Sequence, residues 1–178
     1  MKENRILSLL PDVLARLTSR RVYLLIVLAC LGLLGFGLYL QHVVGLEPCP
    51  MCIVQRYAMI ALAVVAAIAA ALPGPRSHRW FGGLVLLIAA FGAFVAARQS
   101  WLQWYPPEIA TCGRDFYGMI ENFPLQRAIP MIFKGSGDCT AIDWTFLGGT
   151  IANWSFLWFL AFAVLGLWLA LTRRAQPR

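Results

Sequence analysis

Charged side chains are scarce in this chain. They make up 13% of its 178 residues, whereas a soluble domain carries about 25%. The mean hydropathy is +0.70, and no polar stretch is long enough to fold into a large catalytic domain of its own. This composition excludes a soluble enzyme. It predicts a single integral membrane domain over residues 1–178, with little mass outside the bilayer.

Acidic residues are especially few. The chain has 8 acidic and 15 basic residues, which gives a formal net charge of +7. Most of the basic residues are arginines that flank apolar runs, where they act as topology signals. We therefore expect contact with membrane lipid and no binding of nucleic acid.

Four segments are long and apolar enough to span a membrane, which takes about 17–25 residues in a helix. They are Val22–Leu40, Ile53–Leu72, Trp80–Ala97 and Ile151–Leu171. The first could instead be a cleavable signal peptide. Its apolar stretch is longer than a typical signal core, and Leu40-Gln41-His42 offers no small-x-small cleavage site. The expected fold is an all-α membrane protein, a four-helix transmembrane bundle.

The arginines predict the orientation of this bundle. They precede the first span, occupy the turn between spans two and three, and follow the fourth: Arg16, Arg20, Arg21, Arg76, Arg79, Arg173, Arg174 and Arg178. The positive-inside rule then makes both termini cytoplasmic. Loops at about 41–52 and 98–150 face the other side. The second loop holds apolar stretches at 116–120 and 129–133, so part of it is expected to be a short interfacial helix.

Cys49-Pro50-Met51-Cys52 lies directly against the start of the second apolar run. A CxxC pair is typical of redox or metal sites. Pro50 suits the first position of a helix, so Cys49 is expected near the N-cap and Cys52 in the first turn. Backbone N–H groups and the helix dipole favour a thiolate there. Such a pair can meet both water-phase thiols and a lipid-soluble electron carrier.

Four of the five cysteines fall on the outer side under this topology. In a bacterial inner membrane that side is the oxidising periplasm. Cys112 and Cys139 are separated by 26 residues, which does not suit a compact zinc knuckle. They are either a redox pair that exchanges with the CxxC or a static disulfide. Cys30 is mid-span and is expected to be a small buried hydrophobe.

Arg56 is a charged residue inside an apolar run. It follows Cys52 by four residues, so it should lie on the same helical face, one turn deeper. A charge in a membrane helix indicates function by default. Arg56 could stabilise a Cys52 thiolate and hydrogen-bond a carbonyl oxygen of a bound quinone. The alternative is an arginine whose head group snorkels to the interface.

Together these residues make the chain resemble the DsbB family, bacterial inner-membrane oxidases that reoxidise the periplasmic disulfide donor DsbA. The resemblance covers nearly the whole chain. It rests on Gln41-His42-Val43, on Pro48-Cys49-Pro50-Met51-Cys52 with Arg56, on Trp101-Leu102-Gln103-Trp104-Tyr105-Pro106 leading to Ala110-Thr111-Cys112, and on Ser136-Gly137-Asp138-Cys139 followed by Trp144.

The resemblance implies a protein-dithiol:quinone oxidoreductase with four catalytic cysteines. A reduced DsbA-like protein would attack a Cys112–Cys139 disulfide, and Cys112 would form the mixed disulfide. Cys139 would then engage Cys49. Electrons would pass through Cys49–Cys52, and the Cys52 thiolate would form an adduct or charge-transfer complex with the quinone.

The resemblance also implies a cofactor site made of Cys52, Arg56 and Gln99. Ubiquinone is the expected quinone, menaquinone is the alternative, and no metal is expected. Gln99 occupies a position at which some family members carry a histidine near the quinone. A protonation role at that position is not carried over to Gln99.

Other classes of protein remain open at this point. A vitamin K epoxide reductase-like protein usually has its loop pair before the CxxC, whereas here the pair follows it. A DsbD-class transporter would place its cysteines deep within the spans. A membrane protein that binds metal through four thiolates and an assembly factor with inert disulfides are the alternatives without redox turnover.

Overall fold

Long apolar helices dominate the fold. The computed structural model describes residues 19–72, 75–106 and 137–171. In chain order its elements are α2 (Ser19–His42), α3 (Pro50–Ala71), α4 (Pro75–Trp104), α7 (Gly137–Thr140), β1 (Thr145–Phe146), β2 (Gly149–Thr150) and α8 (Ile151–Leu171). The helices α2, α3, α4 and α8 are long and apolar enough to cross a membrane, so the predicted four-helix transmembrane fold is confirmed.

The surface of these helices is also that of a membrane protein. Only 22–33% of each apolar window is buried inside the bundle. The rest points outward, including large side chains such as Leu28, Leu87 and Phe94, which are 60–67% exposed. A soluble protein rarely exposes so large a continuous apolar surface. The outward faces are therefore the lipid-facing side of the bundle.

Proline residues determine where two of the helices begin. Pro50 is the first residue of α3, directly after the N-cap residue Cys49, and Pro75 begins α4. Proline has a fixed φ and no N–H, and both properties suit the first turn of a helix. Residues 73 and 74, which precede Pro75, lie outside the described part.

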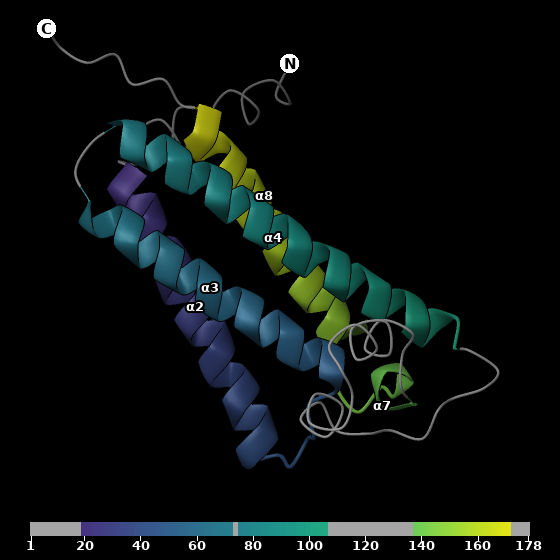
Figure 1. The fold of residues 1–178 in the computed structure, drawn as a ribbon. Coiled ribbons are helices and arrows are strands. Elements are labelled where there is room, and N and C mark those ends of the chain that lie inside the picture. Colours follow the sequence, from purple (N-terminus) through teal and green to yellow (C-terminus); the bar gives the residue numbers. More distant parts are fainter. Residues whose placement is uncertain (1–18, 73–74, 107–136, 172–178) are drawn as a thin grey trace, which may run out of the picture.

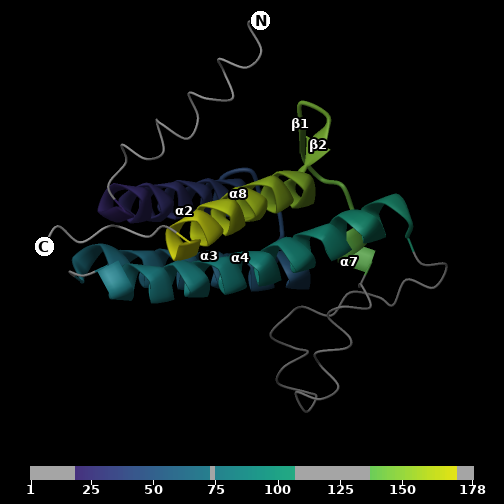
Figure 2. The same ribbon diagram turned by 90° about the horizontal axis from the view of Figure 1, so that it is seen from above.

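The bundle is built from two helix pairs that meet along α3 and α4. α2 packs on α3, α3 on α4, and α4 most extensively on α8 (Figures 1 and 2). Gly92 and Gly166 allow this last contact. A Cβ at Gly92 would lie 2.3 Å from the Phe159 ring, and one at Gly166 would lie 2.7 Å from the backbone nitrogen of Leu86. Small residues at such crossings let the backbones approach closely.

Two buried clusters make up the interior. The larger one runs along the helices and includes Tyr23, Leu62 and Phe159. The smaller one lies at the end of the bundle where α7 packs against α4. It contains Cys49, Met51, Val95, Leu102 and Cys139. Two cysteines that are 90 residues apart in sequence therefore share one hydrophobic cluster.

The start of α2, the end of α3, the start of α4 and the end of α8 lie at the same end of the bundle (Figure 1). Arginines lie at this end, among them Arg20 and Arg21 at the start of α2 and Arg79 near the start of α4. The Nε of Arg79 donates a hydrogen bond of 3.1 Å to the carbonyl oxygen of Ala170. Tyr23 Oη donates to the carbonyl oxygen of His78 at 2.5 Å. The α2–α3 connection, α7 and the hairpin lie at the opposite end, as the predicted topology requires.

The third helix is longer than the predicted span. Arg98 to Trp104 were expected in the outer loop, but they continue α4 without interruption. The physical reason is that a helix does not end where the apolar run ends, since polar residues continue it into the interface. As a consequence Gln99 and Gln103 are helical residues.

A short hairpin precedes α8 and was not predicted. β1 and β2 pair antiparallel, with Thr145 opposite Thr150 and Phe146 opposite Gly149. The turn has positive φ at both central residues, 49° at Leu147 and 80° at Gly148, as a two-residue hairpin turn requires. Leucine rarely adopts this conformation, so the sequence carries a weak turn signal. The expected interfacial helix at 116–120 or 129–133 lies outside the described residues.

Candidate functional site

A cavity of about 630 Å³ opens at the end of the bundle that carries α7 and the hairpin. Its walls come from α2, α3, α4, α8 and the hairpin. They are mostly apolar and aromatic, with Leu33, Phe36, Met59, Trp144 and Trp158 among them. The size and lining are those of a pocket for a small, largely apolar molecule.

The CxxC pair is located at the mouth of α3, as predicted. Cys49 is the N-cap residue, and its Sγ accepts a hydrogen bond from the backbone N–H of Cys52 at 3.2 Å. Cys49 is 5% exposed, whereas Cys52 is half-buried and lines the cavity together with Cys49. The sequence folds in this way because a thiol can cap a helix when Pro50 occupies the next position.

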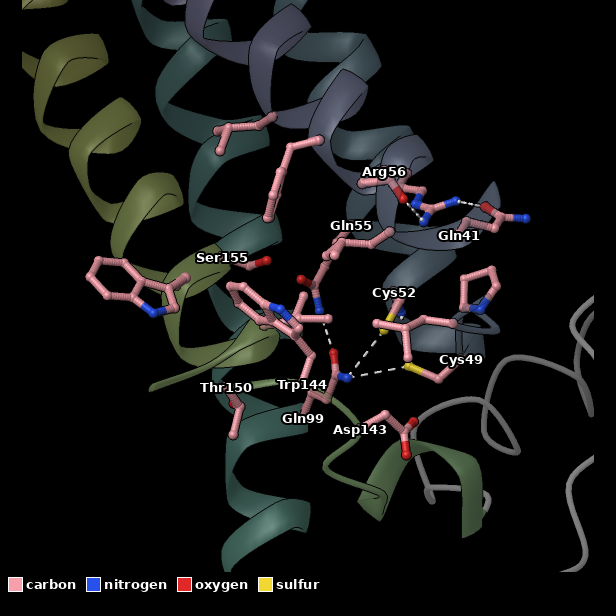
Figure 3. Close-up of a pocket in the computed structure, with 18 of the residues that line it drawn as sticks. Gln41, Cys49, Cys52, Gln55, Arg56, Gln99, Asp143, Trp144, Thr150 and Ser155 are labelled. Atoms are coloured by element: carbon pink, nitrogen blue, oxygen red, sulfur yellow. Dashed lines mark hydrogen bonds between the residues drawn. The ribbon is translucent and has the colours of Figure 1, made fainter. Parts of the chain in front are cut away.

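Gln99 of α4 contacts both sulfurs. Its Nε2 donates to Sγ of Cys49 and to Sγ of Cys52, each at 3.2 Å. Its Oε1 accepts a hydrogen bond of 2.7 Å from Nε2 of Gln55 in α3. Figure 3 shows this chain of contacts from Gln55 through Gln99 to the two cysteines. Gln99 and Gln55 are both 4% exposed, so the carboxamides replace water as partners of the sulfurs.

Arg56 also lines the cavity, on the same face of α3 as Cys52. Its Nη1 donates to Oε1 of Gln41, and its Nη2 donates to the carbonyl oxygen of Gly37 at 3.1 Å. Both acceptors belong to α2. These bonds of Arg56 go to α2, whereas the sulfur of Cys52 accepts a hydrogen bond from Gln99. Arg56 thus lies at the cavity, its hydrogen bonds orient the guanidinium at the α2 wall, and its role in binding a cofactor stays a prediction.

Cys139 reaches the site from α7. It is fully buried, and its side chain hydrogen-bonds with Cys49. This contact with Cys139, a second one with Cys52, and burial all raise the pKa of Cys49 above its ordinary value. The helix start, which is expected to favour a thiolate in the CxxC pair, therefore does not lower the pKa of Cys49 itself. The N-cap hydrogen bond is present, but the neighbouring thiols and the loss of water outweigh it.

Cys112 lies outside the described residues, so its predicted pairing with Cys139 stays a prediction. Cys30 is buried in the core of the bundle and does not line the cavity, as expected for a small hydrophobe. Within residues 19–72, 75–106 and 137–171, no three side chains of histidine, cysteine, aspartate or glutamate form a group that could hold a metal ion.

The sequence did not reveal Gln55, nor the tryptophans and Phe146 that wall the cavity. A signal for Gln55 was present: an uncharged polar residue inside an apolar span, three positions after Cys52, has to find a buried partner. The partner itself lies 44 residues further along the chain. Trp154 also lines the cavity, and its Nε1 donates to the carbonyl oxygen of Phe146 at 3.0 Å.

Known proteins match this chain over nearly its full length. The family "Disulfide bond formation protein DsbB" matches residues 19–169. A disulfide bond formation protein B from Acidovorax sp. (strain JS42) is 72% identical over 146 residues, which cover 82% of this chain and 84% of the relative. Its counterpart from Polaromonas sp. (strain JS666 / ATCC BAA-500) is 69% identical over 159 residues, or 89% of this chain and 94% of the relative.

A third relative with the same name, from Paracidovorax citrulli (strain AAC00-1), is 66% identical over 158 residues, covering 89% of this chain and 90% of its own. The family match over residues 19–169 covers the four apolar helices, except for the last two residues of α8, and the CxxC at the mouth of α3. The sequence resemblance is thereby confirmed. This multi-pass membrane protein belongs to the DsbB family of disulfide bond formation proteins.

Proposed function

We propose that this protein is a protein-dithiol:quinone oxidoreductase. It reoxidises a DsbA-type thiol oxidase in the periplasm and passes the electrons to a membrane quinone through two cysteine pairs. One observation carries the proposal: Cys52 borders an apolar cavity, while its CxxC partner Cys49 contacts the buried Cys139. The CxxC therefore has one sulfur toward a lipid-soluble acceptor and one toward another cysteine.

The residues around the cavity fit a quinone. Its apolar and aromatic walls suit a ring and the start of an isoprenoid chain, and Arg56 supplies a cation at the α2 side. Among the described residues, the bonds of Arg56 to Gln41 and Gly37 use two of the five N–H donors of a guanidinium. Other donors of Arg56 would hold a carbonyl oxygen of the quinone, and Gln99 also lines the cavity. Ubiquinone is the expected quinone, and menaquinone is the alternative.

A bound quinone supplies the capacity to accept two electrons and two protons for each dithiol that becomes a disulfide. The chain's own sulfurs carry the exchange that leads there. A Cys139 thiolate attacks Cys49, the Cys49–Cys52 bond breaks as a Cys49–Cys139 bond forms, and Cys52 leaves as a thiolate. The contact between Cys49 and Cys139 supports this step, because the attacking and attacked sulfurs are already neighbours.

The partner side of the reaction is assigned to Cys112. In our proposal Cys112 pairs with Cys139 at rest and forms the mixed disulfide with the DsbA-type protein. The loops at about 41–52 and 98–150 face the periplasm of a bacterium, and both termini are cytoplasmic in its inner membrane. The arginines Arg20, Arg21 and Arg79 at the opposite end of the bundle support this orientation.

The experiment is anaerobic turnover of the purified protein with a reduced DsbA-type partner and a soluble quinone analogue, followed by quinone absorbance. The wild-type protein is expected to reduce the quinone. Cys52→Ala and Cys49→Ser are expected to abolish turnover while membrane insertion stays normal. Cys30→Ala is the matched control, since Cys30 is buried in the bundle core, and it should keep turnover.

Loss of quinone reduction in the wild type, with stoichiometric zinc and four free thiols, would instead support the metal-binding alternative. Full function of Cys49→Ser would support an assembly factor with inert disulfides. Either outcome would remove the proposed electron path from Cys49–Cys52 to the cavity.

A further inference from the structure

Gln99 offers two hydrogens to two sulfurs. A carboxamide nitrogen carries two N–H groups, and Nε2 of Gln99 lies 3.2 Å from Sγ of Cys49 and 3.2 Å from Sγ of Cys52. One NH₂ group can therefore serve both sulfurs at the same time. Whichever sulfur becomes a thiolate in disulfide exchange already has a donor in place, and no side chain has to move to it.

The orientation of the Gln99 carboxamide decides whether it stabilises or repels a thiolate at Cys49 or Cys52. With NH₂ toward the sulfurs it stabilises a thiolate, and hydrogen bonds to a charged acceptor are the stronger ones. Turned by 180°, the amide would aim its carbonyl oxygen at the sulfurs and repel a thiolate. Gln99 and Gln55 are both 4% exposed, so bulk solvent does little to offset an unfavourable orientation of the amide.

Gln55 is the group that selects the orientation. Its Nε2 donates to Oε1 of Gln99 at 2.7 Å, so the carbonyl end of Gln99 is already bonded on the side away from the sulfurs. Turning Gln99 alone would place two NH₂ groups against each other and leave both without an acceptor. The cost of such unsatisfied buried donors holds Gln99 with NH₂ toward the sulfurs.

We propose that Gln55 is a positioning residue that acts through Gln99, and that the two carboxamides form a neutral clamp for the thiolates of Cys49 and Cys52. The inference rests on the proposed function for its role in turnover. The clamp itself is a property of the free protein and adds no covalent step. It transfers no proton, since a carboxamide does not titrate. An acid or base at the same place could transfer a proton to or from a sulfur, which a carboxamide does not.

The test measures the thiols directly, without a quinone or a partner protein. The reduced, detergent-solubilised full-length protein is treated with iodoacetamide, which forms a carbon–sulfur bond with loss of iodide, across a range of pH. Alkylation of Cys52 is quantified by peptide mass spectrometry. Only a thiolate reacts, so the midpoint of the pH profile reports how well the site stabilises negative charge on Cys52.

Gln55→Met keeps the length of the side chain and removes its donor. We expect the midpoint for Cys52 to move to higher pH by about one unit, or about tenfold less thiolate at a fixed pH below it. Gln99→Met should have at least the same effect. The double variant should match Gln99→Met alone, because Gln55 has no route to the sulfurs once Gln99 is gone.

Ser100→Ala is the matched control. Ser100 is also a buried polar residue of α4, next to Gln99, and its hydroxyl has no hydrogen-bond partner among the described residues. The other ionisable groups around the sulfurs are Cys139 from α7, Arg56 from α3, and Glu47 and Asp143 from the connections. None of these groups is substituted in any of the variants. Ser100→Ala should therefore leave the profile unchanged.

Three outcomes would overturn the proposal: no shift in Gln55→Met, the same further shift when Gln55→Met is added to Gln99→Met, or an equal shift in Ser100→Ala. If Gln55→Met fails to fold, Gln55→Ala takes its place with the same expectation. Because the measurement needs no turnover, the protein can fail to reduce a quinone and still show the clamp. Conversely, quinone reduction with an unshifted profile would reject the clamp and keep the proposed function.

Discussion

Arg56 donates a hydrogen bond from α3 to Oε1 of Gln41 in α2. This bond and the one to the carbonyl oxygen of Gly37 keep the guanidinium at the wall of the cavity. An arginine that only snorkels would instead extend its head group toward the interface. The geometry favours a binding role for Arg56 over the snorkelling alternative.

Removing this cation should weaken the quinone site selectively. We expect Arg56→Met to raise the KM for quinone by about tenfold or more, since a hydrogen bond from a charged donor contributes about 1.5–3 kcal/mol. The KM for the protein thiol partner should change much less. Steady-state kinetics with each substrate varied in turn measures both. The reverse pattern would remove Arg56 from the quinone site.

Gln41 should act on the quinone through Arg56. Gln41→Leu removes the acceptor that orients the guanidinium, so we expect a smaller rise in the KM for quinone than in Arg56→Met. In the Arg56→Met background, Gln41→Leu should add little, because neighbours in one network are not additive. A full additional effect in that background would show that Gln41 contacts the quinone independently.

The raised pKa of Cys49 predicts an unusual reaction profile for this thiol. Free cysteine ionises at a pKa of about 8.5, and only the thiolate reacts with iodoacetamide. A raised pKa moves the reactive fraction to higher pH, so Cys49 in the folded, reduced protein should react slowly near pH 8 and faster as the pH rises further. In denaturant its midpoint should fall back to about 8.5. Slow reaction with an unshifted midpoint would point to restricted access alone.

Close packing of α4 on α8 predicts a position-dependent cost for added methyl groups. Gly166→Ala places a Cβ 2.7 Å from the backbone nitrogen of Leu86, which cannot give way as a side chain could. We expect a loss of about 1–3 kcal/mol in stability, seen as a lower midpoint of thermal unfolding in detergent. Gly83→Ala is the control, because no described atom lies within 4 Å of its Cβ position. Equal effects in the two variants would contradict the packing argument.

The four spans and the place of the CxxC could be predicted from the sequence, because both depend on local physics. Apolar length determines what can cross a bilayer, and Pro50 after Cys49 indicates a helix start. The end of α4 could not be placed in this way. Polar residues such as Arg98 and Gln99 favour the prediction of a loop, yet they extend a helix that is already formed.

The inner contacts of the site depend on distant pairings that no local pattern encodes. Gln99 reaches Cys52 over 47 residues of chain and Gln55 over 44, so the carboxamide network appears only once α3 and α4 pack. The hairpin was missed for a different reason. Leu147 adopts a left-handed conformation with φ of 49°, and turn signals are expected from glycine or asparagine there.

The burial of Cys139 against Cys49 has a consequence for the living cell. Cys139 is fully buried and Cys49 is 5% exposed, so dissolved small thiols such as glutathione have no direct approach to that pair of sulfurs. Direct attack by such thiols on Cys49 or Cys139 is hindered, whereas the half-buried Cys52 borders the cavity. Burial of this kind favours exchange between the two neighbouring cysteines over exchange with thiols in free solution.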